Sequence, residues 1–166
     1  MFQRKRFVIC FLFVIISTLF IGCGAKVQQF ETTLDNGNVV SVSFMPSNGY
    51  ELAEGTSSSF EVVKNGVNMV QGTFVDIATY DAYDAIIGEG DDYVTLLEKG
   101  MKNNNPYIFY KIALPDEDIV EYDCILALSD SNIAVLMGST VDQDTMDTMI
   151  NLFEFSVISS NLGDES

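Results

Sequence analysis

Three short turn signals lie between runs of alternating residues, and they constrain the fold of this chain more than any other feature. They are Asp35-Asn36-Gly37-Asn38, Asn65-Gly66 and Ser129-Asp130-Ser131-Asn132. Sequences of this kind adopt the positive φ angles that tight hairpins require. We therefore expect antiparallel strand pairs over residues 28–34 with 39–45, 60–64 with 67–77, and 119–128 with 133–140. Further strands are predicted over 107–114 and 155–158, a bulge at Gly72, and a loop over 46–59.

Three other segments have the apolar spacing of helices rather than strands. The predicted caps are Thr79 for the first helix, Asp91 or Asp92 for the second, and Thr140 for the third, which opens a capping box with Gln143. Their apolar stripes are Tyr80, Tyr83 and Ile87; Val94, Leu97 and Met101; and Met146, Met149, Ile150 and Phe153. The order of elements predicts an α+β domain with a mainly antiparallel sheet flanked by helices, rather than a doubly wound parallel sheet.

Two short motifs resemble PsbP-like domains. Val42-Ser43-Phe44-Met45-Pro46 followed by Gly49-Tyr50 is similar to the opening strand, proline and glycine-aromatic pair of that family, with Tyr50 in place of its tryptophan. The last predicted helix, which ends in Phe153-Glu154-Phe155-Ser156-Val157, resembles the family's final helix. The resemblance covers residues 30–158 and implies an α/β/α sandwich that works by binding, as accessory and scaffold proteins do. None of the family's ligand motifs is matched, so no functional residue is transferred.

The N-terminus has the pattern of an export signal. Arg4-Lys5-Arg6 precedes sixteen uncharged and mostly apolar residues, 7–22. A helix of that length spans roughly 24 Å, less than the ~30 Å hydrocarbon core of a bilayer. A permanent membrane-spanning helix is therefore the alternative interpretation, and a cleaved signal is the favoured one.

The apolar run ends in Leu19-Phe20-Ile21-Gly22-Cys23-Gly24, which resembles the lipobox of bacterial lipoproteins. In that family the cysteine thiol receives a diacylglyceryl group, and the chain is cut just before the cysteine. The resemblance implies cleavage between Gly22 and Cys23 and lipid attachment at Cys23. We expect a signal peptide over 1–22, a tether over 23–29, a domain over 30–158 and a flexible tail over 159–166. After export, the protein would lie on the extracytoplasmic face of the cell membrane. The lipid would hold it there, because two acyl chains suffice for stable anchoring.

The segment after residue 22 is strongly acidic. It has five lysines, no arginine and all 24 acidic residues of the chain, a formal charge of −19. Nucleic acid and anionic lipid headgroups are bound by clustered basic residues, so the charge argues against both as partners. A protein partner or a cationic partner stays open, and so does a simple role of the charge in solubility.

The chain has no histidine, which removes Ser-His-Asp and Cys-His catalysis and histidine zinc sites. Cys10 leaves with the signal and Cys23 carries lipid, so Cys124 has no partner for a disulfide and is predicted to be a buried, inert thiol. No catalytic residue, resident metal or cofactor is predicted, and the expected function is a non-catalytic binding or accessory module.

Two alternatives to that function rest on acidic clusters. The first cluster is Asp116-Glu117-Asp118 with Glu121 and Asp123, of which the last two point to one strand face; the second is Asp142, Asp144 and Asp147. A calcium-binding surface is one alternative, although the spacing fails the calcium-loop pattern. A carboxylate-dependent hydrolase is the other. A solvated turn and favourable charge at a helix N-terminus explain the same clusters without function.

Tyrosines are the last candidate surface. Tyr80, Tyr83 and Tyr93 gather near the predicted middle helices and suit a recognition face, because tyrosine is enriched at interfaces. Burial of at least two of them in the core is the favoured interpretation.

Overall fold

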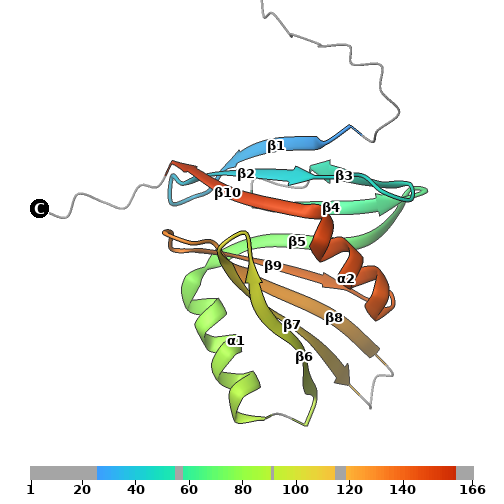
Figure 1. Cartoon of the computed structure of the whole chain (residues 1–166), viewed down its shortest axis with the longest axis vertical. Coiled ribbons are helices and arrows are strands. Elements are labelled where there is room, and N and C mark those ends of the chain that lie inside the picture. Colours follow the sequence, from blue (N-terminus) through green and yellow to red (C-terminus); the bar gives the residue numbers. More distant parts are fainter. Residues whose placement is uncertain (1–25, 55–57, 91, 115–118, 160–166) are drawn as a thin grey trace, which may run out of the picture.

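The computed structural model describes residues 26–54, 58–90, 92–114 and 119–159. Within these residues lie ten strands and two helices (Figure 1). The strands are β1 (Gln28–Thr33), β2 (Val39–Phe44), β3 (Tyr50–Glu54), β4 (Ser59–Lys64), β5 (Val67–Asp76), β6 (Val94–Lys102), β7 (Asn105–Leu114), β8 (Ile119–Ala127), β9 (Ile133–Ser139) and β10 (Phe153–Ser159). The helices are α1 (Ile77–Glu89) and α2 (Gln143–Leu152).

The strands form two sheets. The smaller has the order β1-β2-β10, and the larger has the order β3-β4-β5-β9-β8-β7-β6. All strand pairs in the described chain are antiparallel. The mainly antiparallel α+β architecture predicted from the sequence is therefore confirmed. β3, however, lies inside the segment 46–59 that was predicted to be a loop.

The three predicted hairpins are present, and their turns have the expected backbone geometry. Asn65 and Gly66 both have positive φ, 52° and 76°, as a type I′ turn requires. Gly37 and Asp130 take the positive φ positions of the other two turns. A fourth hairpin joins β6 to β7 through Asn103 and Asn104, whose φ angles are 51° and 66°. Asparagine tolerates this conformation better than most residues, and here two in succession replace the usual Asn-Gly pair.

The segment after residue 92 is a strand, so the predicted second helix is wrong. β6 pairs with β7, and the register shifts by one residue between Leu96 and Glu98. Val94 packs toward α1, whereas Leu97 packs into the core on the opposite side of the sheet. Apolar residues three positions apart thus serve opposite faces of one strand, and this spacing imitates a helical stripe. Met101 is 65 % exposed and belongs to neither core.

Both true helices begin at a different cap from the one predicted. Asp76, not Thr79, caps α1 by accepting a 2.8 Å hydrogen bond from the Ala78 amide. Asp142, not Thr140, caps α2 by accepting from the Thr145 amide at 2.8 Å. In each helix the N-cap is an aspartate carboxylate, whereas the prediction named a threonine hydroxyl. Aspartate is among the residues most strongly preferred at N-caps.

The two helices cover opposite faces of the larger sheet. Alternate residues of a strand point to opposite faces, and β8 shows this clearly. Cys124 and Leu126 enter the main core with α2, whereas Ile125 and Ala127 enter a second core with α1. The predicted stripes of both helices are buried or partly buried in these cores, and Phe153, the last residue of the α2 stripe, begins β10.

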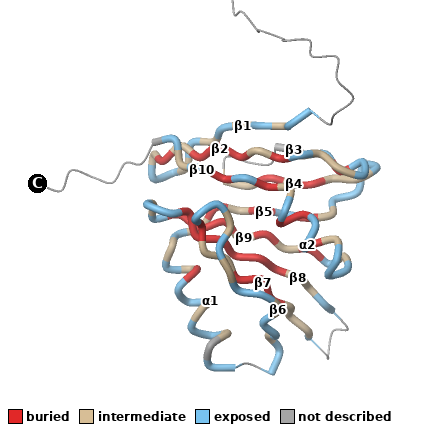
Figure 2. Tube along the Cα trace, viewed as in Figure 1, coloured by how far each residue is buried: buried red, intermediate tan, exposed pale blue. Residues whose placement is uncertain are grey.

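The main core lies between the two sheets, and Phe60 is at its centre. The side chain of Phe60 is fully buried, and its ring centroid lies 5.1 Å from that of Phe153, 5.7 Å from Phe155 and 5.9 Å from Phe74. Figure 2 shows the buried inner strands of both sheets facing one another. These rings come from both sheets, so their contact holds the sheets together.

Gly72 makes room for that ring. A Cβ at Gly72 would lie 2.0 Å from the tip of the Phe60 ring, a distance no pair of atoms tolerates. The predicted bulge at Gly72 is wrong, because the register shift of this strand pair falls near Met69, between the pairs of Val62 and Val63. The glycine is needed for close packing rather than for backbone geometry.

Gly72→Ala is expected to lower the free energy of unfolding by about 2–3 kcal/mol, because the added methyl displaces a ring at the centre of the core. Chemical denaturation measures the loss. Gly100→Ala is the matched control: its Cβ would lie 3.2 Å from the Tyr107 ring, at the edge of the structure, and we expect less than about 1 kcal/mol. Equal losses in the two variants would contradict this account of Gly72.

Candidate functional site

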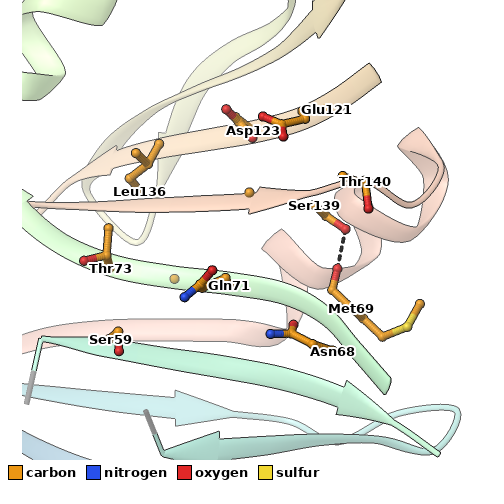
Figure 3. Close-up of a pocket in the computed structure, with 12 residues that line it drawn as sticks. Ser59, Asn68, Met69, Gln71, Thr73, Glu121, Asp123, Leu136, Ser139 and Thr140 are labelled. Atoms are coloured by element: carbon orange, nitrogen blue, oxygen red, sulfur yellow. Dashed lines mark hydrogen bonds between the residues drawn. The ribbon is translucent and has the colours of Figure 1, made fainter. Parts of the chain in front are cut away.

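A large, open concavity lies on the α1 side of the larger sheet, where α1 does not cover it. The pocket is open and has a volume of about 580 Å³. Its floor and walls come mainly from β5, β9 and β8, and Figure 3 shows their side chains. The lining residues are Ser59, Asn68, Met69, Gln71, Gly72, Thr73, Glu121, Asp123, Leu136, Gly138, Ser139 and Thr140.

The course of α1 explains why this part of the sheet is open. The helix begins beside the β8–β9 turn, where the Ile77 amide donates to the Asn132 carbonyl at 3.1 Å. It then crosses toward β6, where Asp84 forms a 2.5 Å ion pair with Lys99. The far end of β8 therefore stays uncovered, and its residues on this face change from Ile125 and Ala127 to Asp123 and Glu121.

A cross-strand row of residues forms the centre of the pocket. Gln71 on β5 pairs with Gly138 on β9, Gly138 pairs with Asp123 on β8, and Asp123 pairs with Tyr110 on β7. Directly paired residues of antiparallel strands share a face of the sheet. Adjacent strands lie ~4.8 Å apart, so Gln71 and Asp123 stand roughly 10 Å apart with the glycine between them. We call this gap above Gly138 the glycine slot.

Gly138 is needed for the position of the Asp123 carboxylate. A Cβ at Gly138 would lie 2.7 Å from Oδ1 of Asp123. The carboxylate thus leans over the bare backbone of β9, and Figure 3 shows it beside Glu121 on β8. Any larger residue at 138 would push the carboxylate away and fill the slot.

Asp123 is the strongest electrostatic anomaly of the pocket. Asp123 is only 8 % exposed, and no described residue forms an ion pair with its carboxylate. Burial, and then the charge of Glu121, raise its pKa to about 7, while the nearby Tyr110 hydroxyl lowers it slightly. The carboxylate is poorly solvated and poorly compensated, and it holds a proton up to neutral pH.

The Tyr110 hydroxyl beside Asp123 also lacks a polar partner. Tyr110 is fully buried, and its hydroxyl is the one buried polar side-chain atom of the described chain without a hydrogen-bond partner. The ring packs against Tyr83 of α1 with centroids 5.3 Å apart. Burial and the charge of Asp123 raise the pKa of Tyr110, so the hydroxyl stays protonated. It lies close enough to influence Asp123 but does not reach hydrogen-bond geometry.

Two residues of the first predicted acidic cluster lie together in the structure. Glu121 and Asp123 do point to one strand face, as predicted, and both line the pocket. Asp116, Glu117 and Asp118 lie outside the described residues. Within the described residues, no group of three or more histidine, cysteine or acidic side chains gathers as a metal site would require.

The second acidic cluster has a structural explanation. Asp142 accepts from the Thr145 amide and, at 3.0 Å, from the Thr145 hydroxyl. These hydrogen bonds lower its pKa. Asp144 lies in the first turn of α2, where a negative charge suits the helix dipole. Asp147, which lies one turn further along, lines a separate and smaller pocket.

The predicted tyrosine face is divided between core and surface. Tyr80 is buried and Tyr83 partly buried in the second core, whereas Tyr93 is 50 % exposed. The prediction that at least two of them pack in the core is consistent with this placement. Cys124 is fully buried and its pKa is raised by burial, as expected of an inert thiol. Gly22 and Cys23, the predicted cleavage and lipid-attachment residues, lie outside the described residues.

Sequence reasoning missed Gln71, Gly138 and Tyr110. Gly138 interrupts an otherwise apolar strand, a pattern that signals close approach of another group. Gln71 is one of two side-chain amides in β5, with Asn68, and its sequence context does not distinguish it. Tyr110 lies in the strand predicted over 107–114, but its pairing with Asp123 depends on the register of β7 and β8.

No protein-family model matches the chain, and neither a curated protein nor a solved structure shows significant similarity to it. Among the described residues, neither helix has the length and apolar character needed to cross a bilayer.

Asp123→Asn is expected to remove a pH-dependent loss of stability. The folded pKa of about 7 exceeds the ordinary value of 3.8, so the folded state binds more protons between those values and stability falls as the pH rises through this range. By pH 8 the loss amounts to at most about 4 kcal/mol. Urea unfolding of wild type and variant at pH 5 to 8 measures it.

Asp142→Asn is the control for that measurement. Its folded pKa is lowered, so its contribution is lost only as the pH falls into the acid range. Between pH 5 and 8 we expect a constant difference from wild type. Parallel profiles for wild type and Asp123→Asn would show that Asp123 is not the titrating group.

Proposed function

We propose that this chain is an extracytoplasmic lipoprotein whose domain is a non-catalytic binding or accessory module. A diacylglyceryl group on Cys23, formed before cleavage after Gly22, would hold it to the cell membrane. The support is the basic start, the apolar residues 7–22 and the lipobox-like ending. Two acyl chains anchor a protein without any further membrane-binding surface.

One observation carries the binding role: the open pocket beside α1 contains the buried carboxylate of Asp123, with which no described residue forms an ion pair. An uncompensated carboxylate of this kind lowers the stability of the fold. Such costs concentrate at functional sites, where a ligand supplies the missing interaction. The polar lining of the pocket is suited to recognition by hydrogen bonds.

We further propose that the domain is PsbP-like. The support is the placement of α1 and α2 on opposite faces of the larger sheet, with the smaller sheet sharing the α2 side. Pro46 follows β2, in the order the resemblance implies, and a helix closes the chain before β10. The segment Phe153-Glu154-Phe155-Ser156-Val157, which resembles the end of the family's final helix, belongs to β10 and not to α2. This assignment favours an accessory role over catalysis.

A carboxylate-dependent hydrolase is the second candidate, and the pair in the pocket favours it. Glu121 and Asp123 are two positions apart on one strand face, roughly 7 Å, within the range of inverting glycosidases. The raised pKa of Asp123 would keep the proton that a general acid needs. The pocket lining has no aromatic side chain on which a sugar could stack, and this favours binding over hydrolysis.

The anchor is tested by mass spectrometry of the N-terminus. We expect the wild-type chain to begin at a lipid-modified Cys23. Cys23→Ser should keep residues 1–22 and carry no lipid, because the thiol is the acceptor. Cys10→Ser, in the same apolar segment, should be processed like wild type. An uncut and unlipidated wild-type N-terminus would overturn the anchor.

The binding role is tested by photo-crosslinking in intact cells. A photoreactive residue at Gln71, which is exposed at the glycine slot, should yield an adduct. The same residue at Ile86, which is 47 % exposed on α1, should not yield it. Absence of an adduct at position 71, or the same adduct at both positions, would contradict a binding role for this pocket. Turnover of glycans that is lost in both Glu121→Gln and Asp123→Asn would favour the hydrolase instead.

A further inference from the structure

The glycine slot has the chemistry of a cation site, and the inference drawn from it rests on the proposed binding function. Its β8 side carries two carboxylates, Asp123 and Glu121, whereas its β5 side carries the neutral groups of Gln71, Asn68 and Thr73. No described lysine lines the pocket. The slot is therefore negative on one side and neutral on the other.

We infer that the glycine slot binds the primary ammonium group of an organic ligand, with Asp123 as its ion-pair partner. The buried carboxylate of Asp123 is the independent indication of a ligand, since it is more than nine-tenths buried, lines the slot and has no ion-pair partner among the described residues. Burial of a charge is tolerated when an opposite charge compensates it. An ammonium group supplies that charge together with three hydrogen-bond donors.

The geometry favours a compact ammonium over a guanidinium. Oδ1 of Asp123 leans over the backbone of Gly138, so a planar fork that needs both oxygens has a poor approach. A compact ammonium needs one free oxygen. Its other donors can reach Glu121 or, across the slot, the side-chain oxygen of Gln71.

The geometry also favours an ammonium over calcium. Calcium takes six to eight oxygen ligands. The described part of the chain places two carboxylates at the slot and gathers no group of three or more candidate ligands anywhere. Two carboxylates on one side of an open pocket leave most of the coordination sphere to water.

The ammonium could belong to a lysine side chain of a peptide or to a small free amine, and two probes distinguish these sources. The full-length chain in a non-ionic detergent is titrated with Nα-acetyl-lysine methylamide and, separately, with ethanolamine. Backbone amide resonances of residues 71, 123 and 138 report binding by NMR. Nα,Nε-diacetyl-lysine methylamide, in which acetylation of the side-chain nitrogen has removed the charge, is the matched control probe, and calcium chloride is the competing cation.

We expect a saturable shift of the three resonances with at least one amine, and none with the acetylated probe. Asp123→Asn should weaken the affinity at least tenfold. Gln71→Ala, at an exposed position that leaves the core untouched, should weaken it a fewfold, and it keeps the test valid if the Asp123 variant does not fold. Stronger binding of the lysine probe points to a peptide, and stronger binding of ethanolamine points to a free amine.

Three results would overturn the inference. They are equal shifts with the acetylated probe, full affinity in Asp123→Asn, or shifts with calcium but with neither amine. Failure here is distinguishable from failure of the binding function. If the amines do not bind but position 71 still crosslinks, the ligand class is wrong and the binding role stands. If crosslinking also fails, both are wrong.

Discussion

The contact between the Phe60 ring and the bare backbone of Gly72 is the constraint on which the rest of the structure depends. Phe60 lies on β4 of the larger sheet, and its ring meets Phe153 and Phe155 of the smaller sheet. Because the ring occupies the space where a Cβ at 72 would stand, the two sheets approach closely. Aromatic rings bury large areas and make tilted contacts worth a further ~0.5–1.5 kcal/mol each. The β1–β2 hairpin and the closing strand β10 are thereby fixed to the larger sheet.

That arrangement also determines where a site can exist. One face of the larger sheet packs against the smaller sheet and α2, and the pocket with Asp123 lies on the opposite face. α1 covers part of that face, from the β8–β9 turn to β6, and leaves the far end of β8 open. The sequence of β8 follows this boundary: Ile125 and Ala127 lie under the helix, whereas Asp123 and Glu121 lie beyond it. The pocket is the part of the sheet that neither layer covers.

Most of the fold could be predicted because its signals are local. A turn such as Asn65-Gly66 indicates a hairpin through the backbone preference of its own two residues. The alternation of apolar and polar residues along a strand such as β2 can likewise be recognised without knowing its partner strand. The second predicted helix failed because Val94 and Leu97 serve opposite faces of β6, and only the layers packed on those two faces make both positions apolar. The predicted helix caps were also wrong. Thr79 and Thr140 fit the sequence pattern of an N-cap, but the carboxylates of Asp76 and Asp142 accept the hydrogen bonds at the first turns of the two helices.

The site was less predictable because it depends on register across four strands. Glu121 and Asp123 could be placed on one face from their spacing, yet nothing local distinguishes them from the other acidic residues of a very acidic chain. Asp123 becomes exceptional only when β9 brings Gly138 beneath its carboxylate and β7 brings Tyr110 beside it. Long-range pairing therefore creates the burial that raises its pKa, and no single segment of the sequence contains that information.

The charge of the domain and the burial of Asp123 act in the same direction. A formal charge of −19 after residue 22 attracts cations over long range and raises their concentration near the surface. This attraction is unspecific and is weakened by salt. The glycine slot adds what the net charge lacks, namely a poorly solvated carboxylate with space on one side and neutral hydrogen-bonding groups on the other. A cation that enters the slot replaces the proton held by Asp123 and restores the stability that its burial costs. Ligand binding, ionisation of Asp123 and stability of the fold are therefore coupled through one residue.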